Sequence, residues 1–246
     1  MNIRHFIFYT LLLTAFLNSS LSVAQSGKKD NNDPTVKHGA WEKKDQKGNI
    51  VYKGYFNNNV PEGEFTYYDS TGKVTAKVIF SEKGTNAYTQ MFQRGFKVSE
   101  GLYINEKKDG LWKYFNADSI VIAEENYNKG VPHGAWKTYY AKGSLLEELT
   151  YVNGKKEGNW VQYFYDGPIK TKATYHNDKL EGLATFFHPN GKVFISGPYK
   201  GNLKDGVWMH MNDKGVAEKK ETWSMGFLTS EEFYDKKLER MVKEEK

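Results

Sequence analysis

The sequence of 246 residues contains no cysteine and only six prolines. Without cysteine the chain has no disulfide bonds, no thiol catalysis and no zinc site built on cysteine. Small secreted domains commonly depend on disulfides, so packing, repetition or size must stabilise this one. The few prolines and the many aromatic residues are unlike a disordered or low-complexity chain.

The only long apolar run lies near the N-terminus, over residues 6–17. Arg4 precedes this run and small residues follow it at 22–24, which is the pattern of a secretory signal peptide. We therefore predict a signal peptide at residues 1–24, a mature chain that begins at Gln25, and export to the periplasm or out of the cell. No cysteine follows the run, which excludes lipid attachment of the bacterial lipoprotein type. The sequence contains no second apolar segment, so we predict no membrane span in the mature chain.

Charge of one sign is not concentrated anywhere in the sequence. The formal net charge is +5, and 35 Lys and Arg residues are interleaved with 30 Asp and Glu residues. A nucleic-acid surface clusters its basic residues, so we expect no nucleic-acid partner and a soluble surface of mixed charge. What the sequence does have is 15% aromatic residues, among them 17 tyrosines, and 23 glycines, a composition typical of β-strands and turns.

An internal repeat of 24 residues organises the chain from residue 38 onward. Its mark is a polar residue followed by glycine. The opening glycines are Gly39, Gly63, Gly110, Gly134, Gly158, Gly182 and Gly206, and a degenerate copy that begins at Ala87 and is one residue short lies between the second and third of them. We number the copies 1 to 8 in chain order and count positions within a copy from its opening residue as position 0.

Four positions of the copy have a recurrent residue type, and together they fix the register. Position 9 is glycine in six copies, and position 11 is apolar in all eight. Position 2 is tryptophan in five copies, namely Trp41, Trp112, Trp136, Trp160 and Trp208. Position 17 is aromatic or apolar in every copy, namely Phe56, Phe80, Ile104, Tyr127, Tyr151, Tyr175, Tyr199 and Trp223. We interpret the opening glycines and the position 17 residues as structural.

Each copy is predicted to be a β-hairpin, because side chains alternate along a strand and positions 11, 13, 15 and 17 then share one face. A single hairpin cannot bury its apolar face alone, whereas stacked copies make each aromatic column continuous. We therefore expect an all-β fold, an elongated single-layer antiparallel β-meander of about eight hairpins over residues 38–228. Residues 25–37 are expected to form a polar linker. Residues 229–246 are expected to form a charged cap, either a short helix that starts at a Thr229–Glu232 capping box or a frayed tail.

The unit resembles the MORN repeat, in the bacterial variant found in YwqK-like antitoxin proteins. The resemblance rests on the opening of copy 5, residues 134–140 (GAWKTYY), and on its closing segment, residues 151–158 (YVNGKKEG). It extends over residues 38–228 and implies an elongated β-meander used for protein contacts or, in some members, for membrane association. Copy 3 departs from the pattern because it has Thr89 at position 2, and we expect an irregular bend or loop between Gly84 and Gly95.

Candidate catalytic and metal-binding residues fall at repeated positions. His38 and His133 share the position before the opening glycine with five carboxylates, namely Glu62, Asp109, Glu157, Glu181 and Asp205. A position that accepts both residue types is typical of a solvent-facing turn, and one carboxylate per copy falls short of the six to eight oxygens that calcium takes. The chain has no phosphate-binding loop, no nucleophile elbow and no His-Glu-x-x-His motif. We therefore predict no catalytic residue, no metal site and no cofactor.

The aromatic residues are the candidate binding residues. A tryptophan column can fill the concave side of a twisted sheet, or it can also present rigid contact area to a partner. Because one sheet layer leaves some aromatic area exposed, a binding role is kept beside the packing role. The candidate partner-binding aromatics are Trp41, Trp112, Trp136, Trp160, Trp208 and Tyr140.

The function hypothesis that these observations favour is a non-catalytic exported repeat protein that binds or scaffolds another protein in the cell envelope. Two alternatives stay open. One is an antitoxin-like protein that neutralises a toxin, which the signal peptide restricts to targets outside the cytosol. The other is a module that binds a membrane surface or a glycan through Trp, Tyr and Lys side chains.

Overall fold

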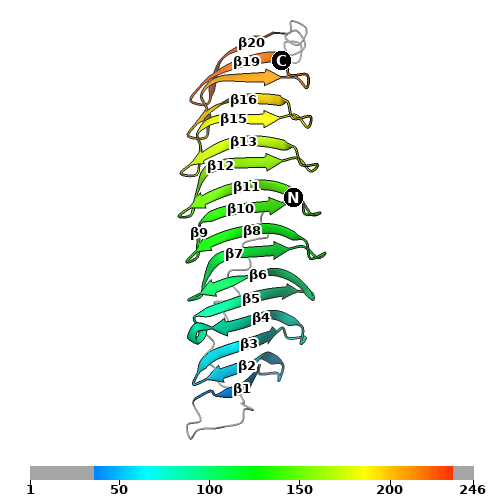
Figure 1. The fold of residues 1–246 in the computed structure, drawn as a ribbon, viewed down its shortest axis with the longest axis vertical. Helices are drawn as coiled ribbons and strands as arrows, with labels where there is room; N and C mark the ends of the chain where they lie inside the picture. Colours follow the sequence, from blue (N-terminus) through cyan, green and yellow to red (C-terminus); the bar gives the residue numbers. More distant parts are fainter. Residues whose placement is uncertain (1–35, 235–246) are drawn as a thin grey trace.

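The computed structural model describes residues 36–234, which form one open antiparallel β-sheet. Strands that follow one another in the chain are neighbours in the sheet, so the strands are stacked in chain order along the long axis (Figure 1). The predicted single-layer β-meander is confirmed. Among the described residues no helix is long and apolar enough to cross a membrane. The predicted signal peptide, residues 1–24, lies outside the described residues.

Each of the eight copies contributes one hairpin, and in copies 5, 7 and 8 the first strand is divided into two segments. The hairpins are, in chain order, β1 (Gly39–Lys44) with β2 (Ile50–Asn57), β3 (Val60–Tyr68) with β4 (Val74–Ser81), β5 (Asn86–Gln93) with β6 (Phe96–Ile104), β7 (Lys107–Phe115) with β8 (Val121–Asn128), β9 (Val131–Pro132) and β10 (Gly134–Tyr139) with β11 (Leu145–Val152), β12 (Lys155–Tyr163) with β13 (Ile169–His176), β14 (Lys179–Leu180) and β15 (Gly182–Phe187) with β16 (Val193–Lys200), and β17 (Leu203–Lys204) and β18 (Gly206–Met211) with β19 (Ala217–Ser224). β20 (Phe227–Phe233) follows the eighth hairpin.

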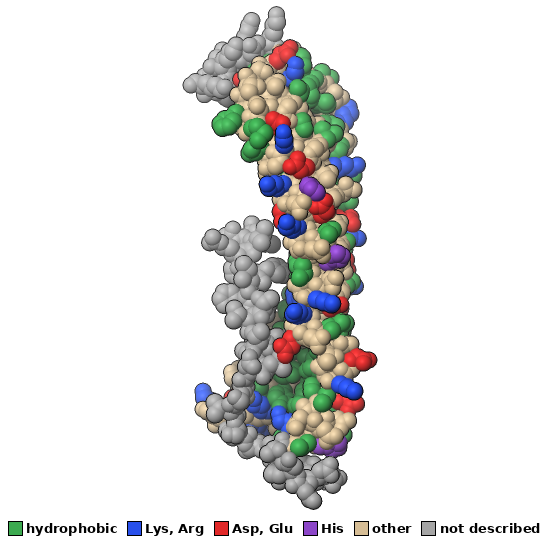
Figure 2. Space-filling model, turned by 90° about the vertical axis from the view of Figure 1, so that its left-hand side faces the viewer, with side chains coloured by type: hydrophobic (Ala, Val, Ile, Leu, Met, Phe, Trp, Pro, Cys, Tyr) green, Lys and Arg blue, Asp and Glu red, His purple; other side chains and the backbone are tan. Residues whose placement is uncertain are grey.

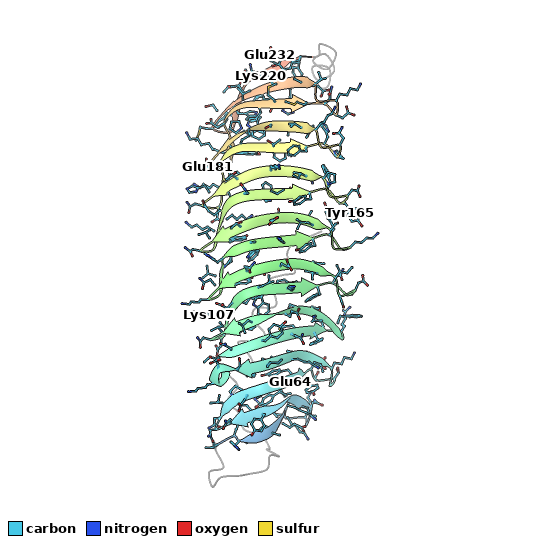
Figure 3. The ribbon with its side chains drawn as sticks, in the orientation of Figure 1. Glu64, Lys107, Tyr165, Glu181, Lys220 and Glu232 are labelled. Atoms are coloured by element: carbon cyan, nitrogen blue, oxygen red, sulfur yellow. The ribbon has the colours of Figure 1, made fainter. Side chains whose placement is uncertain are left out.

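The two long edges of the sheet are made of different turns. Except between copies 2 and 3, two residues with positive φ connect one copy to the next, as at Asn153 (φ 50°) and Gly154 (φ 85°), and such turns match the twist of the strands they join. Longer loops join the two strands within a copy. In copy 1 the Asp45 carboxylate stabilises this loop by accepting hydrogen bonds from two of its backbone N–H groups, both at 2.9 Å. Glu181, beside a connection between copies, and Tyr165, in a loop within a copy, mark the opposite edges in Figure 3.

The opening glycines recur because their backbone is left-handed. Their φ values run from +64° at Gly110 to +97° at Gly134, a region that a residue with a Cβ adopts at a cost. The pairing register with the preceding strand also shifts beside the opening glycines that follow Gly39. For example, Leu149 faces Trp160 whereas Tyr151 faces Lys156. A β-bulge therefore lies at position 0 of the copy, and glycine supplies the backbone conformation that this bulge requires.

The two faces of the sheet differ in chemistry. We call the face that carries positions 2, 4, 13, 15 and 17 the aromatic face, and the opposite one the charged face. Buried side chains concentrate on the aromatic face, where Phe65 and Trp112 are each 2% exposed. On the charged face, lysine and glutamate pair across strands, as Lys53 does with Glu42 at 3.0 Å. Seen along the edge with the connections between copies, the molecule is narrow, and acidic and basic side chains are interspersed (Figure 2).

Copy 3 keeps its hairpin but shortens its loop. A two-residue turn of Arg94 (φ 53°) and Gly95 (φ 85°) joins β5 to β6 in place of the longer loop. The missing residue moves the second strand by one position, so Tyr103 faces the opening residue of the copy and takes position 17. The prediction of Ile104 at this position is wrong. The irregularity expected between Gly84 and Gly95 is limited to a 3-10 turn at Glu82–Gly84, the turn at Arg94 and Gly95, and a register shift toward β6 between Met91 and Phe92, which the other hairpins share. Toward β4 the strand β5 pairs regularly.

The array continues past residue 228. Thr229 and Glu232, predicted as a helix-capping box, lie instead in β20, which pairs with β19. β20 occupies the place of the first strand of a ninth copy, and Ser230, 24 residues after Gly206, pairs with Thr222. The acidic residues Glu231 and Glu232 lie on this outermost strand, where charge disfavours pairing with further strands. The rest of the predicted cap, residues 235–246, lies outside the described residues.

Removing residues 134–157, one complete copy, is expected to leave a folded but shorter sheet. The deletion joins His133 to Gly158 in the same repeat register. It places Glu125 beside Trp160, whereas in the wild type Glu125 lies beside Trp136. Far-UV circular dichroism per residue should be unchanged, and the longest dimension from small-angle X-ray scattering should fall by about 10 Å, two strand spacings. Loss of the β-sheet spectrum on this deletion would contradict an additive repeat architecture.

Candidate functional site: the aromatic face

The aromatic face carries a ladder of rings from positions 2 and 17. In its middle part Trp136 lies between two tyrosines, with ring centroids 5.6 Å from Tyr127 and 4.6 Å from Tyr151. The next copy repeats the arrangement with Trp160 and Tyr175 at 5.5 Å. These separations and the tilted ring planes are those of favourable aromatic pairs. Repetition of one hairpin thus produces a continuous aromatic surface along the sheet.

The five tryptophans of position 2 divide into two groups by exposure. Trp112 and Trp208 are buried, at 2% and 0% exposed. Trp41, Trp136 and Trp160 are half-buried. The buried pair therefore stabilises the core, and the contact area that the tryptophans offer to a partner comes from the other three.

Glycine at position 15 of the preceding copy decides which aromatic rings are buried. A Cβ added to Gly101 would overlap the Trp112 ring, and a Cβ added to Gly197 would overlap the Trp208 ring. The buried Phe65 has the same relation to Gly54. By contrast, the half-buried Trp136 follows Glu125, and Trp160 follows Leu149. A missing side chain lets the next ring lie flat on the backbone, whereas a larger side chain there holds the ring away from it.

The indole N–H groups are satisfied within the sheet. Trp112, Trp136 and Trp208 donate to the backbone carbonyl at position 16 of the preceding copy, at 3.0, 3.0 and 3.1 Å. Trp160 donates instead to the Glu147 carboxylate at 2.7 Å. The hydrogen bonds orient the rings, so a partner at this face meets ring surface.

Tyr140, the sixth candidate, lies apart from the tryptophans. It belongs to the loop of copy 5, where its ring centroid is 5.2 Å from that of Tyr165. Its hydroxyl donates to the backbone carbonyl of Tyr163 at 2.9 Å and so links the loops of copies 5 and 6. The structure places Tyr140 at the loop edge, where it stabilises the stacking of copies.

Four lysines on the aromatic face were missed by sequence reasoning. Each stands two residues before the opening glycine and stacks on a ring of position 2 or 17 of its copy, with its Nζ 4.5 to 4.9 Å from the nearest such ring centroid. They are Lys37, Lys108, Lys156 and Lys204. Burial lowers the pKa of Lys108 and of Lys37. The sequence does show lysine at one fixed position in four copies. Only the pairing of the strands shows that these lysine side chains contact the aromatic rings.

Three glutamates of the eight hairpins also lie on this face. Glu125 accepts a hydrogen bond from the Tyr127 hydroxyl at 2.7 Å, and Glu147 accepts one from Gln162 at 3.0 Å in addition to that from Trp160. After the effect of burial, the carboxylates of Asp178, Glu147 and Glu125 also raise the pKa of the Tyr151 hydroxyl. The middle of the aromatic face is thus acidic as well as aromatic.

Glu221, the third glutamate, is 6% exposed and surrounded by two lysines and a histidine. Its oxygens lie 2.5 Å from Lys219, 3.1 Å from His210 and 3.3 Å from Lys204. Burial alone would raise the pKa of Glu221, but Lys219, Trp223 and His210 lower it to about 2. This buried network ties the last two hairpin strands together on the aromatic face.

The repeated carboxylates before the opening glycines have a structural role in the turns. Asp109, Glu157, Glu181 and Asp205 each accept a hydrogen bond from the backbone N–H that begins the next connection between copies, at 2.8 to 3.0 Å. His133 Nδ1 lies 3.4 Å from the corresponding N–H of Asn153. Carboxylate and imidazole alternate at this position because both accept a hydrogen bond. Within residues 36–234 no three His, Asp or Glu side chains are grouped as metal ligands.

A shallow groove of about 540 Å³ crosses the aromatic face over copy 7. Copy 7 has Ala184 at position 2, so no tryptophan occupies its part of the ladder. Its lining includes Phe186, Ile195, Tyr199 and Trp208, together with Lys170 and Lys204. It is a further place, besides the half-buried tryptophans, where aromatic area is accessible.

The fold and this face define a class: a repeat protein formed by one open β-meander with an aromatic face. The model of a MORN repeat variant matches residues 61–82, 132–153 and 180–200. Each stretch begins two residues before an opening glycine and covers both strands of one copy. The expected MORN-type repeat is therefore found in copies 2, 5 and 7, and the whole fold is consistent with it. Repeats of this type suit binding or scaffolding.

Comparison with known proteins adds little beyond the repeat. No curated protein matches the sequence significantly. The crystal structure of TarM matches with 23% identity over 39% of this chain and 19% of that chain, at a TM-score of 0.31. A mutant of S. aureus TarM in complex with fondaparinux, alpha-GlcNAc-glycerol and UDP matches with 20% identity over 48% of this chain and 21% of that chain, also at 0.31. The TcdB2-TccC3-Cdc42 structure matches with 10% identity over 74% of this chain and 13% of that chain, at 0.17.

This chain thus spans about a fifth of the length of the TarM chains that it matches. TM-scores of 0.31 and below carry no conclusion about function.

Proposed function

We propose that this chain is a non-catalytic exported repeat protein that binds another protein through its aromatic face and so acts as a scaffold in the cell envelope. The observation that carries the proposal is the half-buried ladder of Trp136 and Trp160 with their tyrosines, on a face that no second layer of residues 36–234 covers. Trp and Tyr supply large contact area at low cost in conformational entropy, and they dominate protein-binding hot spots.

The non-catalytic part of the proposal is supported by repetition. A catalytic constellation is needed once, whereas the acidic and histidine side chains before the opening glycines recur in register and accept backbone hydrogen bonds. Export is supported by the apolar run and small residues at 1–24. A toxin-neutralising role is a special case of the same proposal, in which the bound protein is a toxin outside the cytosol. N-terminal sequencing of the protein from the envelope fraction should give Gln25 as the first residue.

Partner recovery tests the binding role. Crosslinking and pull-down from the cell envelope with the mature protein should recover a partner, and the double variant Trp136→Ala, Trp160→Ala should recover about 30-fold less, because truncating central aromatic hot spots typically costs 2 kcal/mol or more. The matched control is Leu111→Ala, Leu183→Ala, which removes exposed apolar side chains from the charged face and should leave recovery unchanged. Equal loss in both variants contradicts the assignment to the aromatic face. Tryptophan-dependent binding to liposomes or polysaccharide, with no protein recovered, would replace the protein partner by a membrane or a glycan.

A further inference from the structure

Lysine and tryptophan occur together in the copies of this chain. Four of the five copies with tryptophan at position 2 carry lysine two residues before the opening glycine. In copy 4 Lys108 Nζ lies 4.7 Å from the Trp112 ring centroid and 4.9 Å from that of Tyr127, and it donates a hydrogen bond to the Tyr114 hydroxyl at 2.6 Å. In copy 1 Lys37 lies 4.8 Å from the Phe56 ring. The tryptophan copies thus share an aromatic receptor for an ammonium group, and in these four the chain supplies the ammonium itself.

Copy 5 is the exception. It has Trp136 at position 2 but Pro132 in the place of the lysine. Trp136 keeps its tyrosine neighbours on both sides, at 5.6 and 4.6 Å. Within the described part of the chain no lysine or arginine is stacked on the Trp136 ring. The aromatic receptor is therefore built in copy 5 without the cation that the chain supplies elsewhere.

Two carboxylates lie on the strands next to that of Trp136. Glu125 is in register with Trp136, and Glu147 pairs with Thr138, two residues further along. Glu125 lies on β8 and Glu147 on β11, and both strands pair with β10, which carries the tryptophan. No Lys, Arg or His nitrogen of residues 36–234 lies within 4.0 Å of either carboxylate. Lys108 affects Glu125 only through a longer-range interaction, because its ammonium group is engaged with the rings of its own copy. A carboxylate has about four acceptor sites, so tyrosine, indole and amide donors leave each of these two able to accept more.

The same repeat position in copy 8 shows what Glu125 lacks. Glu221 also stands at position 15, and two lysines and a histidine surround it, with Lys219 at 2.5 Å, His210 at 3.1 Å and Lys204 at 3.3 Å. A half-buried carboxylate without a cation is costly unless a partner compensates it. The surroundings of Trp136 thus combine an unoccupied aromatic receptor with two carboxylates that no cation of the described residues contacts, and both features suit a cation.

We propose that Trp136, Glu125 and Glu147 bind a lysine or arginine side chain of the partner protein, in the place that the chain's own lysine takes in the other tryptophan copies. This inference rests on the proposed protein-binding function and specifies the chemistry of the partner. Carboxylates favour a cation that donates hydrogen bonds. An ammonium or guanidinium group does so, whereas the quaternary ammonium of a choline lipid does not, and the site is therefore assigned to a protein side chain.

Indole resonances test the proposal directly. The full mature chain, labelled with ¹⁵N at its tryptophan indoles, is titrated at constant ionic strength with N-acetyl-arginine amide, and in separate samples with N-acetyl-glutamine amide and with tetramethylammonium chloride. The arginine amide should shift the Trp136 resonance saturably and leave those of Trp112 and Trp208 in place. The neutral amide should have no effect, and tetramethylammonium should bind at least about threefold more weakly because it donates no hydrogen bond.

Two variants place the result at this site. Pro132→Lys supplies the lysine that copy 5 lacks and should abolish the Trp136 response, whereas Leu180→Lys, the same change two copies away, should leave it unchanged. Glu125→Gln should weaken binding about fivefold, the loss of a charge-assisted contact at a partly exposed site. Each variant must keep the melting temperature of the wild type within a few degrees, so that a lost response reports on binding.

Several outcomes would overturn the proposal: equal shifts at all indoles, no shift at Trp136, persistence of the response in Pro132→Lys, or tetramethylammonium binding as tightly as the arginine amide. The last outcome would point to a choline headgroup. The pull-down separates this inference from the proposed function. If partner recovery depends on Trp136 and Trp160 while the arginine amide does not bind, the cation receptor fails and the binding face stands. If the amide binds but recovery does not depend on these residues, the proposed function fails.

Discussion

Gly197→Ala is expected to destabilise the protein by about 1–3 kcal/mol, the usual cost of inserting a methyl group into a packed core. The new Cβ would overlap the Trp208 ring, which is 0% exposed and has no room to move away. At this chain length each kcal/mol lowers the melting temperature by about 2–4 °C. Thermal or urea unfolding followed by circular dichroism measures the change.

A double-mutant cycle separates overlap from other effects of the substitution. Trp208→Ala alone should cost about 3–5 kcal/mol through the cavity it leaves. In that background Gly197→Ala should be close to neutral, because it recreates the neighbouring pair Ala173 and Ala184, which copies 6 and 7 already pack in a buried cluster. The coupling energy between the two sites should thus be about 1–3 kcal/mol. Equal costs of Gly197→Ala in both backgrounds would show that the ring does not explain the glycine.

Glu221→Gln is expected to cost roughly 3 kcal/mol at neutral pH, because the pKa of Glu221 is lowered from 4.5 to about 2 in the folded chain. A depressed folded-state pKa stabilises the protein above the unfolded value. The contribution is therefore complete above about pH 4.5 and is lost as the pH falls toward 2. The amide also leaves Lys204 and Lys219 close together without the charge that lies between them.

Urea unfolding of wild type and Glu221→Gln between pH 2 and 7 measures this effect. The difference between the two proteins should be largest above pH 4.5 and should shrink toward pH 2. The matched control is Glu148→Gln, which breaks an exposed pair with Lys137 at 3.8 Å on the charged face and should cost less than about 1 kcal/mol. A pH-independent difference would contradict the role of the charge.

Much of the fold could be predicted from the sequence, because each structural requirement recurs at the same position of every copy. Glycine at position 0 recurs where the backbone is left-handed, as at Gly134 with φ +97°. The alternation of side chains then places positions 2 and 17 on one face, where Trp136 meets Tyr151. Period, hairpins, turns and the aromatic face all follow from local rules that every copy repeats.

The register of copy 3 could not be predicted in the same way. The deletion of one residue in its loop is visible as the shorter spacing, but its place within the copy is not. Only the pairing of β5 with β6 shows that Tyr103 replaces Ile104 at position 17. The end of the array is a similar case, since Thr229 and Glu232 satisfy a helix-capping pattern but pair with β19 as a strand.

The candidate site, too, could be predicted from the sequence only in part. The sequence by itself determined that tryptophans line one face, because position 2 is a single column of the repeat. Only the tertiary structure decided that Trp208 is core and Trp136 is accessible, since the burial of each ring depends on position 15 of the preceding copy, Gly197 in one case and Glu125 in the other. The structure also showed that the lysines stack on the aromatic rings and that copy 5 lacks this contact. The physical reason is the same, because side chains from different strands meet only when the sheet is assembled.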